Sequence, residues 1–394
     1  MPKKNVKNIV LPHSQAKLDL YRDYLNEYLP VLMNTPYVSH INVYDVFCGA
    51  GVYTDGKYGS PLIAAECINA NIEVAEKRGD SATTSISLTV NDLDAGKVEF
   101  VGQKLTELSE NRFKTTPLNM TATKMFELVK DETSRFTNRH RSLVFVDPYG
   151  YSDITKENLF GLLQTRKTEV ILFLPVSNLY RFTDAAQTNI DDKSFEPLRR
   201  FLYEFFSEDS RMMTSEVKNI YDYINEVRKA FSFDGSFYSS AYYIKRDRTN
   251  HYALFFIGPH IYGLEKFLQA KWKNDSLGQG FDVRYSAPSL FGGGLDEVDI
   301  YNTKSKLESC IKEKISNSPY ISNVELYEYI LVMQFLPNHA KSIFDNLVST
   351  GLLEIYDDKL VLQGKVRGYY LTYGNYSKKS NILKFKLRTK NGTI

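Results

Sequence analysis

Short apolar runs alternate with longer amphipathic stretches through most of this chain. The runs have the length of buried strands, and they occupy 41–45, 85–90, 117–121, 142–147 and 169–175. After Glu169, the last of them is continuously apolar, as strands covered on both faces are. Between the runs, apolar residues recur at the three- and four-residue steps of a helix. Strands that alternate with helices predict a doubly wound α/β sheet.

One amphipathic segment precedes the first strand. Apolar residues recur from Leu18 to Leu32, and Ser14 stands where a helix cap is favoured. The stripe ends near Pro36, because proline disfavours continuation of a helix. We therefore predict that 1–36 holds an N-terminal helix that packs on the core of the sheet.

An insertion and a hairpin are predicted after the fifth strand. Segment 176–236 has helical periodicity, which indicates a helical insertion. Segments 238–245 and 252–258 flank a polar turn, which predicts an antiparallel hairpin that closes the sheet. These elements together predict a Rossmann-like, seven-stranded sheet of class I methyltransferase architecture over 37–298.

The C-terminal part of the chain has a different order of elements. Three helical segments and two strand-like segments are predicted there, at 304–315, 323–333, 338–350, 351–356 and 359–362. Three helices followed by a β-hairpin is the order of a winged helix, so 299–394 is predicted to form a winged-helix-like α+β domain. The predicted recognition helix, 338–350, carries one lysine. Because winged helices also dock proteins, protein contact stays open as an alternative.

Composition narrows the class of protein. The chain has 394 residues, of which 43% are apolar and 24% charged, so it can bury the cores of more than one domain. No apolar run approaches the roughly 20 residues that span a bilayer, and the N-terminus lacks the apolar region of a signal peptide. Cys48, Cys67 and Cys310 lack metal-ligand spacing and are predicted to be reduced thiols. We expect a cytoplasmic protein with no membrane contact and no metal site; oligomeric state leaves no signal.

Positive charge is concentrated at the C-terminal end. Residues 359–394 hold nine basic side chains and no acidic one, so subtracting nine from the overall +2 leaves −7 for the remainder. Four tyrosines lie among them, and basic residues interleaved with aromatic rings are typical of nucleic-acid surfaces. The predicted contacts are Lys365, Arg367, Lys378, Lys379, Lys384, Lys386 and Arg388. The alternative is a solvated β edge that lysines protect from aggregation.

The first strand ends in a candidate cofactor loop. Asp45, Phe47, Gly49 and Gly51 fit D-x-F-x-G-x-G, in which the two glycines let a ligand approach the backbone at a strand end. The third glycine of dinucleotide sites is absent, which favours S-adenosylmethionine over a nicotinamide cofactor. Asp45 would orient the methionine ammonium directly or through water.

A second acidic group is expected to bind the cofactor ribose. Asp92 and Asp94 both follow the second strand, where an acidic side chain holds ribose hydroxyls in related sheets. Asp94 is also well placed to cap the helix that follows. The choice between the two stays open from the sequence alone.

The fourth strand ends in candidate catalytic residues. Asp147-Pro148-Tyr149-Gly150 is similar to the D/N-P-P-Y/F motif of enzymes that methylate amino groups of bases. A carboxylate can accept an amine N–H and free the nitrogen lone pair, proline fixes the turn, and an aromatic ring can stack on an extruded base. The alternative is a structural turn that Asp147 caps and Tyr149 packs against.

Several blocks in consistent order resemble the three-Cys-motif partner proteins. The blocks are His13 to Lys17, 44–53, the G-S-P-L-I-A run 59–64, 91–94, 145–150 and 253–258. The G-S-P block is also similar to a ribosomal-RNA adenine-N6 methyltransferase family, and D-P-Y-G to tRNA guanine-N2 dimethyltransferases. The resemblance implies a bacterial methyltransferase-like protein encoded beside a three-Cys-motif, radical-SAM-like partner. The three cysteines of the family name belong to that partner.

Two hypotheses follow for the function. The first is an S-adenosylmethionine-dependent N-methyltransferase that acts on a base amino group in RNA or DNA. The second is a catalytically inactive Rossmann-like subunit that binds nucleic acid or a partner protein, for example in antiviral defence against phage.

Overall fold

The chain folds into two compact units. One unit comprises Met1–Asp275 and Gln279–Ala287, and the other comprises Ser276–Gly278 and Pro288–Ile394. The computed structural model describes residues 9–79, 84–217, 219–275, 280–282, 297–364 and 366–388. The predicted domain boundary after residue 298 falls within a helix that begins at Glu297.

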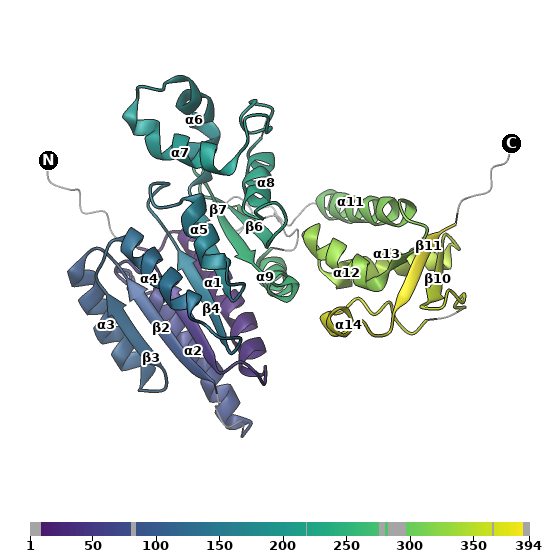
Figure 1. Cartoon of the computed structure of the whole chain (residues 1–394), viewed down its shortest axis with the longest axis horizontal. Helices are drawn as coiled ribbons and strands as arrows, with labels where there is room; N and C mark the ends of the chain where they lie inside the picture. The colour runs from purple at the N-terminus through teal and green to yellow at the C-terminus, as the bar shows by residue number, and fades with distance from the viewer. Residues whose placement is uncertain are drawn as a thin grey trace. The chain divides into compact units, whose positions relative to one another are not determined.

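The first unit is built on one mixed sheet (Figure 1). Its strands are β1 His40–Asp45, β2 Ser85–Asn91, β3 Lys114–Leu118, β4 His140–Val146, β5 Thr168–Leu174, β6 Tyr238–Lys245, β7 His251–Gly258 and β8 Gly280–Asp282. Their order is β3-β2-β1-β4-β5-β7-β6-β8, and β7 runs antiparallel to both of its neighbours. The first seven strands have the order of a class I methyltransferase sheet, which confirms the predicted fold class.

Two details of the sheet differ from the prediction. The third strand is 114–118 rather than 117–121, because Lys114 and Thr115 already pair with β2. An eighth strand, β8, pairs parallel with the end of β6. It has three residues, which is too short for periodicity to reveal it.

Helices cover both faces of the sheet. They are α1 Pro12–Met33, α2 Ser60–Lys77, α3 Ala95–Ser109, α4 Ala122–Ser134, α5 Lys156–Leu163 and α9 Ile261–Asn274. Helix α1 packs against α2 and α9, and its Tyr21 ring lies 4.3 Å from the ring of Phe145 on β4. The predicted cap at Ser14 is wrong: α1 begins two residues earlier, because Pro12 suits the first turn of a helix.

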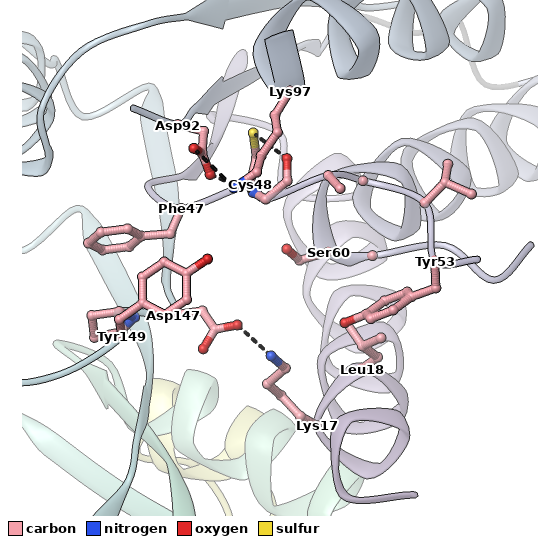
Figure 2. A pocket seen from close by; sticks show the side chains of 16 residues that line it. Lys17, Leu18, Phe47, Cys48, Tyr53, Ser60, Asp92, Lys97, Asp147 and Tyr149 are labelled. Atoms are coloured by element: carbon pink, nitrogen blue, oxygen red, sulfur yellow. Dashed lines mark hydrogen bonds and ion pairs between the residues drawn. The ribbon is translucent and has the colours of Figure 1, made fainter. Parts of the chain in front are cut away.

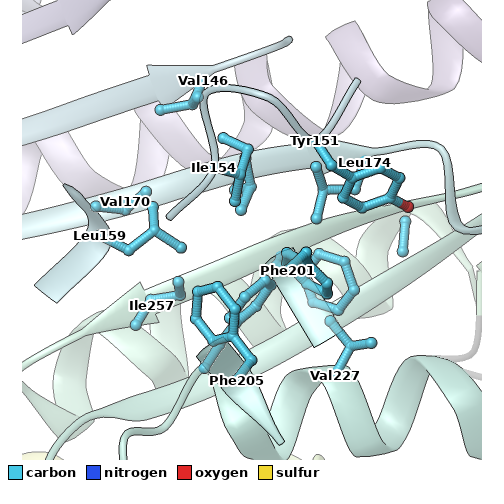
Figure 3. Close-up of a cluster of buried hydrophobic side chains, with 14 of the residues drawn as sticks. Val146, Tyr151, Ile154, Leu159, Val170, Leu174, Phe201, Phe205, Val227 and Ile257 are labelled. Carbon is cyan, nitrogen blue, oxygen red and sulfur yellow. The ribbon is translucent and has the colours of Figure 1, made fainter. Parts of the chain in front are cut away.

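The face of the sheet opposite to α1 holds a large apolar cluster (Figure 3). Alternate residues of β4 and β5, such as Val146 and Val170, face this cluster, since successive side chains of a strand point to opposite faces. Helices of the insertion complete it: α6 Val176–Thr188, η1 Lys193–Phe195, α7 Glu196–Phe205 and α8 Ile220–Ala230. Phe201 of α7 is fully buried among them. The insertion therefore shares its core with the sheet.

The second unit has a small sheet of its own. Its elements are α11 Glu297–Ser316, β9 Ile321–Ser322, α12 Asn323–Val332, α13 Pro337–Ser349, β10 Leu353–Asp357, α14 Tyr373–Lys378 and β11 Leu383–Leu387. The strands lie in the order β10-β11-β9, and both pairings are antiparallel.

The predicted hairpin strand 359–362 is wrong. After the turn at Asp357, only one isolated bridge forms, between Tyr356 and Leu362. The partner of β10 is β11, in which Phe385 is fully buried opposite Ile355. The local segment still bonds to β10, since the Asp357 amide donates to the Val361 carbonyl (3.0 Å) and the Gln363 amide to the Ile355 carbonyl (2.8 Å), but these contacts do not extend into a strand.

Candidate functional site

A cavity opens where three neighbouring strands end. Strands β2, β1 and β4 are parallel and adjacent, so the loops that follow them converge at one edge of the sheet. A cavity of about 270 Å³ lies there, close to the lower bound of small-molecule sites. Its lining residues are Lys17, Leu18, Phe47, Cys48, Gly49, Ala50, Gly51, Val52, Tyr53, Gly59, Ser60, Asp92, Lys97, Asp147, Pro148 and Tyr149. Figure 2 shows side chains of the loop after β1, such as Phe47, and of the segment after β4, such as Asp147 and Tyr149, around this cavity.

The loop after β1 depends on its two glycines. Gly49 and Gly51 have φ angles of +60° and +71°, which L side chains rarely adopt. A Cβ at Gly51 would lie 2.6 Å from Cγ2 of Val101, whereas one at Gly49 would meet no atom within 4 Å. Gly51 is therefore required for packing on α3. Gly49 leaves its side open toward the cavity, where a ligand can approach the backbone.

Asp92 and Asp94 have separate roles in the structure. Asp92 lines the cavity, and its carboxylate accepts hydrogen bonds from the amides of Gly49 (3.0 Å) and Asp94 (2.9 Å). The Lys97 ammonium lies 3.7 Å from the same carboxylate. Asp94 caps α3 by accepting from the amides of Gly96 and Lys97, and it does not line the cavity. Of the two, only Asp92 is placed to meet a ligand.

A buried asparagine holds the converging loops together. The Asn91 amide donates to the carbonyls of Val46 and Met120, both at 3.1 Å, and its oxygen accepts from the Met120 amide at 3.0 Å. The ends of β1, β2 and β3 are thus tied by one side chain. This fixes the position of the neighbouring Asp92.

Asp147 is paired with a lysine from the N-terminal helix. The Lys17 ammonium donates to Oδ2 of Asp147, while Oδ1 receives no hydrogen bond from the residues that the structure describes. Burial alone would lower the pKa of Lys17, but the charge and hydrogen bond of Asp147 raise it. Lys17 is therefore a fixed cation at neutral pH. Its ammonium also lies 4.7 Å from the centre of the Phe173 ring.

The two residues after Asp147 differ in exposure. Pro148 is buried, and it lines the cavity beside Asp147. Tyr149 is 93% exposed, so its ring stands free at the mouth of the cavity (Figure 2). A ring in this position is available to stack on a ligand.

Asp45 lies behind the cavity rather than on its wall. It is fully buried and is not one of the lining residues. Burial raises the pKa of Asp45 to about 7, with the Ser60 side chain opposing the shift and the Asp147 charge adding to it. Its Oδ2 has no hydrogen-bond partner among the described residues, and the same holds for the hydroxyl of Tyr21. A bridging water or a polar ligand group would satisfy such atoms.

Sequence reasoning missed four polar residues of the cavity as site residues. They are Lys17, Tyr53, Ser60 and Lys97. Lys17 precedes Tyr21 by four residues and so lies on the same face of α1 as the apolar stripe. A lysine within a buried stripe signals a buried ion pair, because an unpaired ammonium is too costly to bury. The signal was thus present in the sequence.

The predicted basic residues of the second unit are spread over several elements. Lys384 and Lys386 lie on β11, and the Lys386 ammonium sits 5.5 Å from the centre of the Tyr320 ring. Arg388 pairs with Glu354 at 2.7 Å. The remaining ones are Lys378 and Lys379 at the end of α14 and Arg367 in the loop before it. Lys365 lies outside the described residues.

Two further features concern the described part of the chain. No helix there is long and apolar enough to cross a membrane. No group of three or more histidine, cysteine, aspartate or glutamate side chains in the same residues could hold a metal ion.

Comparison with known proteins gives only distant structural likenesses. No protein-family model matches the sequence, and no curated protein matches it. A Listeria monocytogenes protein assigned as a class I S-adenosylmethionine-dependent methyltransferase is 12% identical with a TM-score of 0.30, over 64% of each chain. A SAM-dependent methyltransferase from Agrobacterium tumefaciens is 10% identical with a TM-score of 0.32, also over 64% of each chain.

A third structure is the N-terminal domain of human METTL16 in complex with SAH. It is 13% identical with a TM-score of 0.27, over 62% of this chain and 70% of that one. The chain spans about 64% of the length of each of the two bacterial proteins. At such low TM-scores these likenesses carry no argument, and the fold assignment rests on the strand order of the sheet.

Proposed function

We propose that this chain is an S-adenosylmethionine-dependent N-methyltransferase that acts on a base amino group in nucleic acid. One observation carries the proposal: a single cavity is lined by the glycine loop after β1, by Asp92 after β2 and by Asp147-Pro148-Tyr149 after β4. The first two groups suit a nucleoside cofactor at a strand end, and the third suits an amine-bearing base.

Residues present in the cavity fit the cofactor. Gly49 offers a backbone with no side chain toward the ligand, and Asp92 offers a carboxylate for ribose hydroxyls. The unpartnered Oδ2 of Asp45 offers a buried negative site behind the loop, which the methionine ammonium would reach through a water. When bound, S-adenosylmethionine supplies an electrophilic methyl group.

The substrate side depends on the free oxygen of Asp147. With Oδ2 held by Lys17, Oδ1 remains to accept an N–H from the amine and to raise the electron density on its nitrogen. Pro148 fixes the turn that presents this carboxylate, and Tyr149 offers an exposed ring on which the base can stack. The target base and the choice between RNA and DNA are left open by this arrangement.

For the second unit we propose a winged-helix-like domain. Its element order and its sheet order β10-β11-β9 support that proposal. Nucleic acid is the proposed ligand of its basic residues. The resemblance to three-Cys-motif partner proteins, the partner itself and a role in phage defence stay predictions, and co-purification of the chain with a neighbouring gene product tests them.

The second candidate function is a catalytically inactive subunit. The Lys17–Asp147 ion pair favours it, because the ammonium already occupies one oxygen of the carboxylate that the amine needs. On this hypothesis the cavity does not bind the cofactor, and activity is found only in a partner protein.

Calorimetry of the full chain with S-adenosylmethionine and S-adenosylhomocysteine separates the two candidates. The first predicts a dissociation constant on the order of 1–100 μM, or about −5.5 to −8 kcal/mol. Asp92→Ala should weaken binding by at least tenfold. Asp131→Ala, an exposed aspartate on α4, is the matched control and should bind as the parent does.

Methyl transfer to total bacterial RNA and DNA is then measured with isotope-labelled cofactor. Asp147→Asn should abolish transfer while leaving affinity for S-adenosylhomocysteine, which lacks the sulfonium charge, within about threefold. If the parent protein takes up no cofactor at millimolar concentration, the methyltransferase proposal fails and the inactive subunit is favoured.

A further inference from the structure

A basic turn lies at the same edge of the sheet as the cavity. Strand β7 runs antiparallel to both β5 and β6, so β6 points the same way as β5 and its carboxyl end reaches the cavity edge. The residues that follow, Arg246 to Asn250, form the β6–β7 turn, in which Arg246, Asp247, Arg248 and Thr249 are exposed. This turn has no role in the site described above.

The one acidic residue of the turn is engaged in holding its shape. The Asp247 carboxylate accepts hydrogen bonds from the amides of Thr249 and Asn250, both at 2.8 Å. Arg246 approaches the same carboxylate with its Nε at 3.7 Å, and both side chains are close to half exposed. The turn is thus a fixed platform whose exposed charge is mainly positive.

Helix α6 is anchored to this turn and adds a further arginine. The Ser177 hydroxyl accepts from the His251 amide at 2.6 Å and donates to its carbonyl at 2.9 Å. The Arg181 guanidinium donates to the Thr249 carbonyl. Arg181, Lys245, Arg246 and Arg248 together form what we term the basic turn surface.

A continuous stack of rings joins this surface to the cavity. Lys17 lies over Phe173, Phe173 stacks on Tyr252 at 5.2 Å, and Tyr252 stacks on His13 at 5.4 Å. Burial, together with the charges of Arg246 and Lys17, lowers the pKa of His13 to about 4. His13 therefore lies within electrostatic range of both the basic turn surface and the cavity lysine.

We infer that the basic turn surface binds the phosphates of a single-stranded nucleic acid whose base enters the cavity. The inference rests on the proposed function, and it names where the substrate strand lies. A base that enters a pocket brings its flanking phosphates to the rim, where fixed arginines can bind them. The ring of Tyr149 stands at the mouth of the same cavity and suits the base between those phosphates.

The test uses fluorescence anisotropy of the full chain with a labelled 20-nucleotide RNA and a DNA of the same sequence. Arg246→Ala/Arg248→Ala is compared with Arg78→Ala/Arg139→Ala, which removes the same charge from exposed residues outside the cavity edge. For the first variant we expect affinity to fall on the order of tenfold near 0.1 M salt, and the salt slope to fall by about 1.4 for two lost phosphate contacts. The control variant should keep both values.

Three outcomes overturn the inference: no binding by the parent, equal affinity of the two variants, or displacement of the oligonucleotide by poly-glutamate as readily as by unlabelled RNA. The last outcome would indicate an acidic protein as the partner. Calorimetry with S-adenosylhomocysteine on the same variants separates this test from that of the proposed function. If the Arg246→Ala/Arg248→Ala variant binds S-adenosylhomocysteine normally and binds the oligonucleotide as the parent does, only the role of the basic turn surface is refuted. If the parent binds no cofactor, the proposed methyltransferase function is refuted.

Discussion

Substitution of Gly51 by alanine tests how the cofactor loop is held. At φ +71° a Cβ at this position would lie 2.6 Å from Cγ2 of Val101, a distance that real side chains essentially never show. Val101 is fully buried in α3, so it has little room to move away. The left-handed backbone costs about 1–2 kcal/mol with any L side chain, and overpacking costs about 1–3 kcal/mol more. We expect Gly51→Ala to destabilise the first unit by about 2–5 kcal/mol.

Gly49→Ala is the matched comparison. Its φ of +60° carries a similar backbone cost, but its Cβ would meet no atom within 4 Å. We therefore expect a loss of only about 1–2 kcal/mol in the free energy of unfolding. Because this Cβ would point toward the open side of the loop, cofactor affinity should fall even though the fold is kept.

Urea unfolding followed by tryptophan fluorescence measures these values. The single tryptophan, Trp272, lies in α9 of the first unit, so its signal reports that unit and avoids a two-state assumption for the whole chain. The double variant Gly51→Ala/Val101→Ala should lose about 1–2 kcal/mol less free energy of unfolding than the sum of the two single variants, because removal of Cγ2 relieves the contact. Equal losses for Gly49→Ala and Gly51→Ala, together with additive behaviour in the double variant, would refute the packing argument.

Three further predictions concern charge and the small sheet. Lys17→Met should lower the free energy of unfolding by about 1–3 kcal/mol, because it leaves the Asp147 carboxylate, which is one-quarter exposed, without its partner. The double variant Lys17→Met/Asp147→Asn should lower it by less in the same urea assay. Burial raises the pKa of Asp45 to about 7 in the folded chain, so the protonated carboxyl contributes fully to the free energy of unfolding below about pH 4, and this contribution is lost as pH rises through 7. The free energy of unfolding of the parent should therefore fall between pH 5 and 8. Asp45→Asn should reduce this fall by on the order of 2–4 kcal/mol. A chain that ends at residue 382 loses β11 and the buried Phe385, so limited proteolysis should digest the second unit while the Trp272 transition stays unchanged.

The architecture of the first unit follows from local patterns because each strand is either continuously apolar or bounded by polar turns. Strand β5 is buried at every position, as the apolar residues of the predicted strand 169–175 indicate. The second unit was harder to predict. The turn at Asp357 does form, and the segment after it bonds to β10, but the strand that pairs along β10 lies much farther along the chain, at Leu383 to Leu387. Its buried Phe385 is a tertiary contact that local patterns do not indicate.

The site residues likewise divide into those that the local sequence predicts and those that depend on tertiary packing. Those that follow strand ends, such as Gly49, Asp92 and Asp147, were predictable because parallel strands bring their carboxyl ends to one edge. Lys17 was not predicted as a site residue. Its place in the apolar stripe of α1 indicates a buried ion pair, but only the packing of α1 across the sheet identifies Asp147 as the partner. Asp45 was expected to orient the methionine ammonium directly or through water; it is fully buried and is not among the residues that line the cavity.

The placement of Lys17 bears directly on the two proposed functions. If both Asp45 and Asp147 are ionised, the single Lys17 ammonium leaves the cluster with one net negative charge, which suits a cationic ligand such as S-adenosylmethionine. If Asp45 is protonated, Lys17 and Asp147 neutralise each other and this attraction disappears. A functional cofactor site therefore requires affinity for S-adenosylmethionine, whose net charge is positive, to rise with pH through about 7. Affinity for S-adenosylhomocysteine, which lacks the sulfonium and has no net charge, should change less. An inactive subunit has no reason to show that difference, because its buried charges would serve only to hold α1 against the sheet.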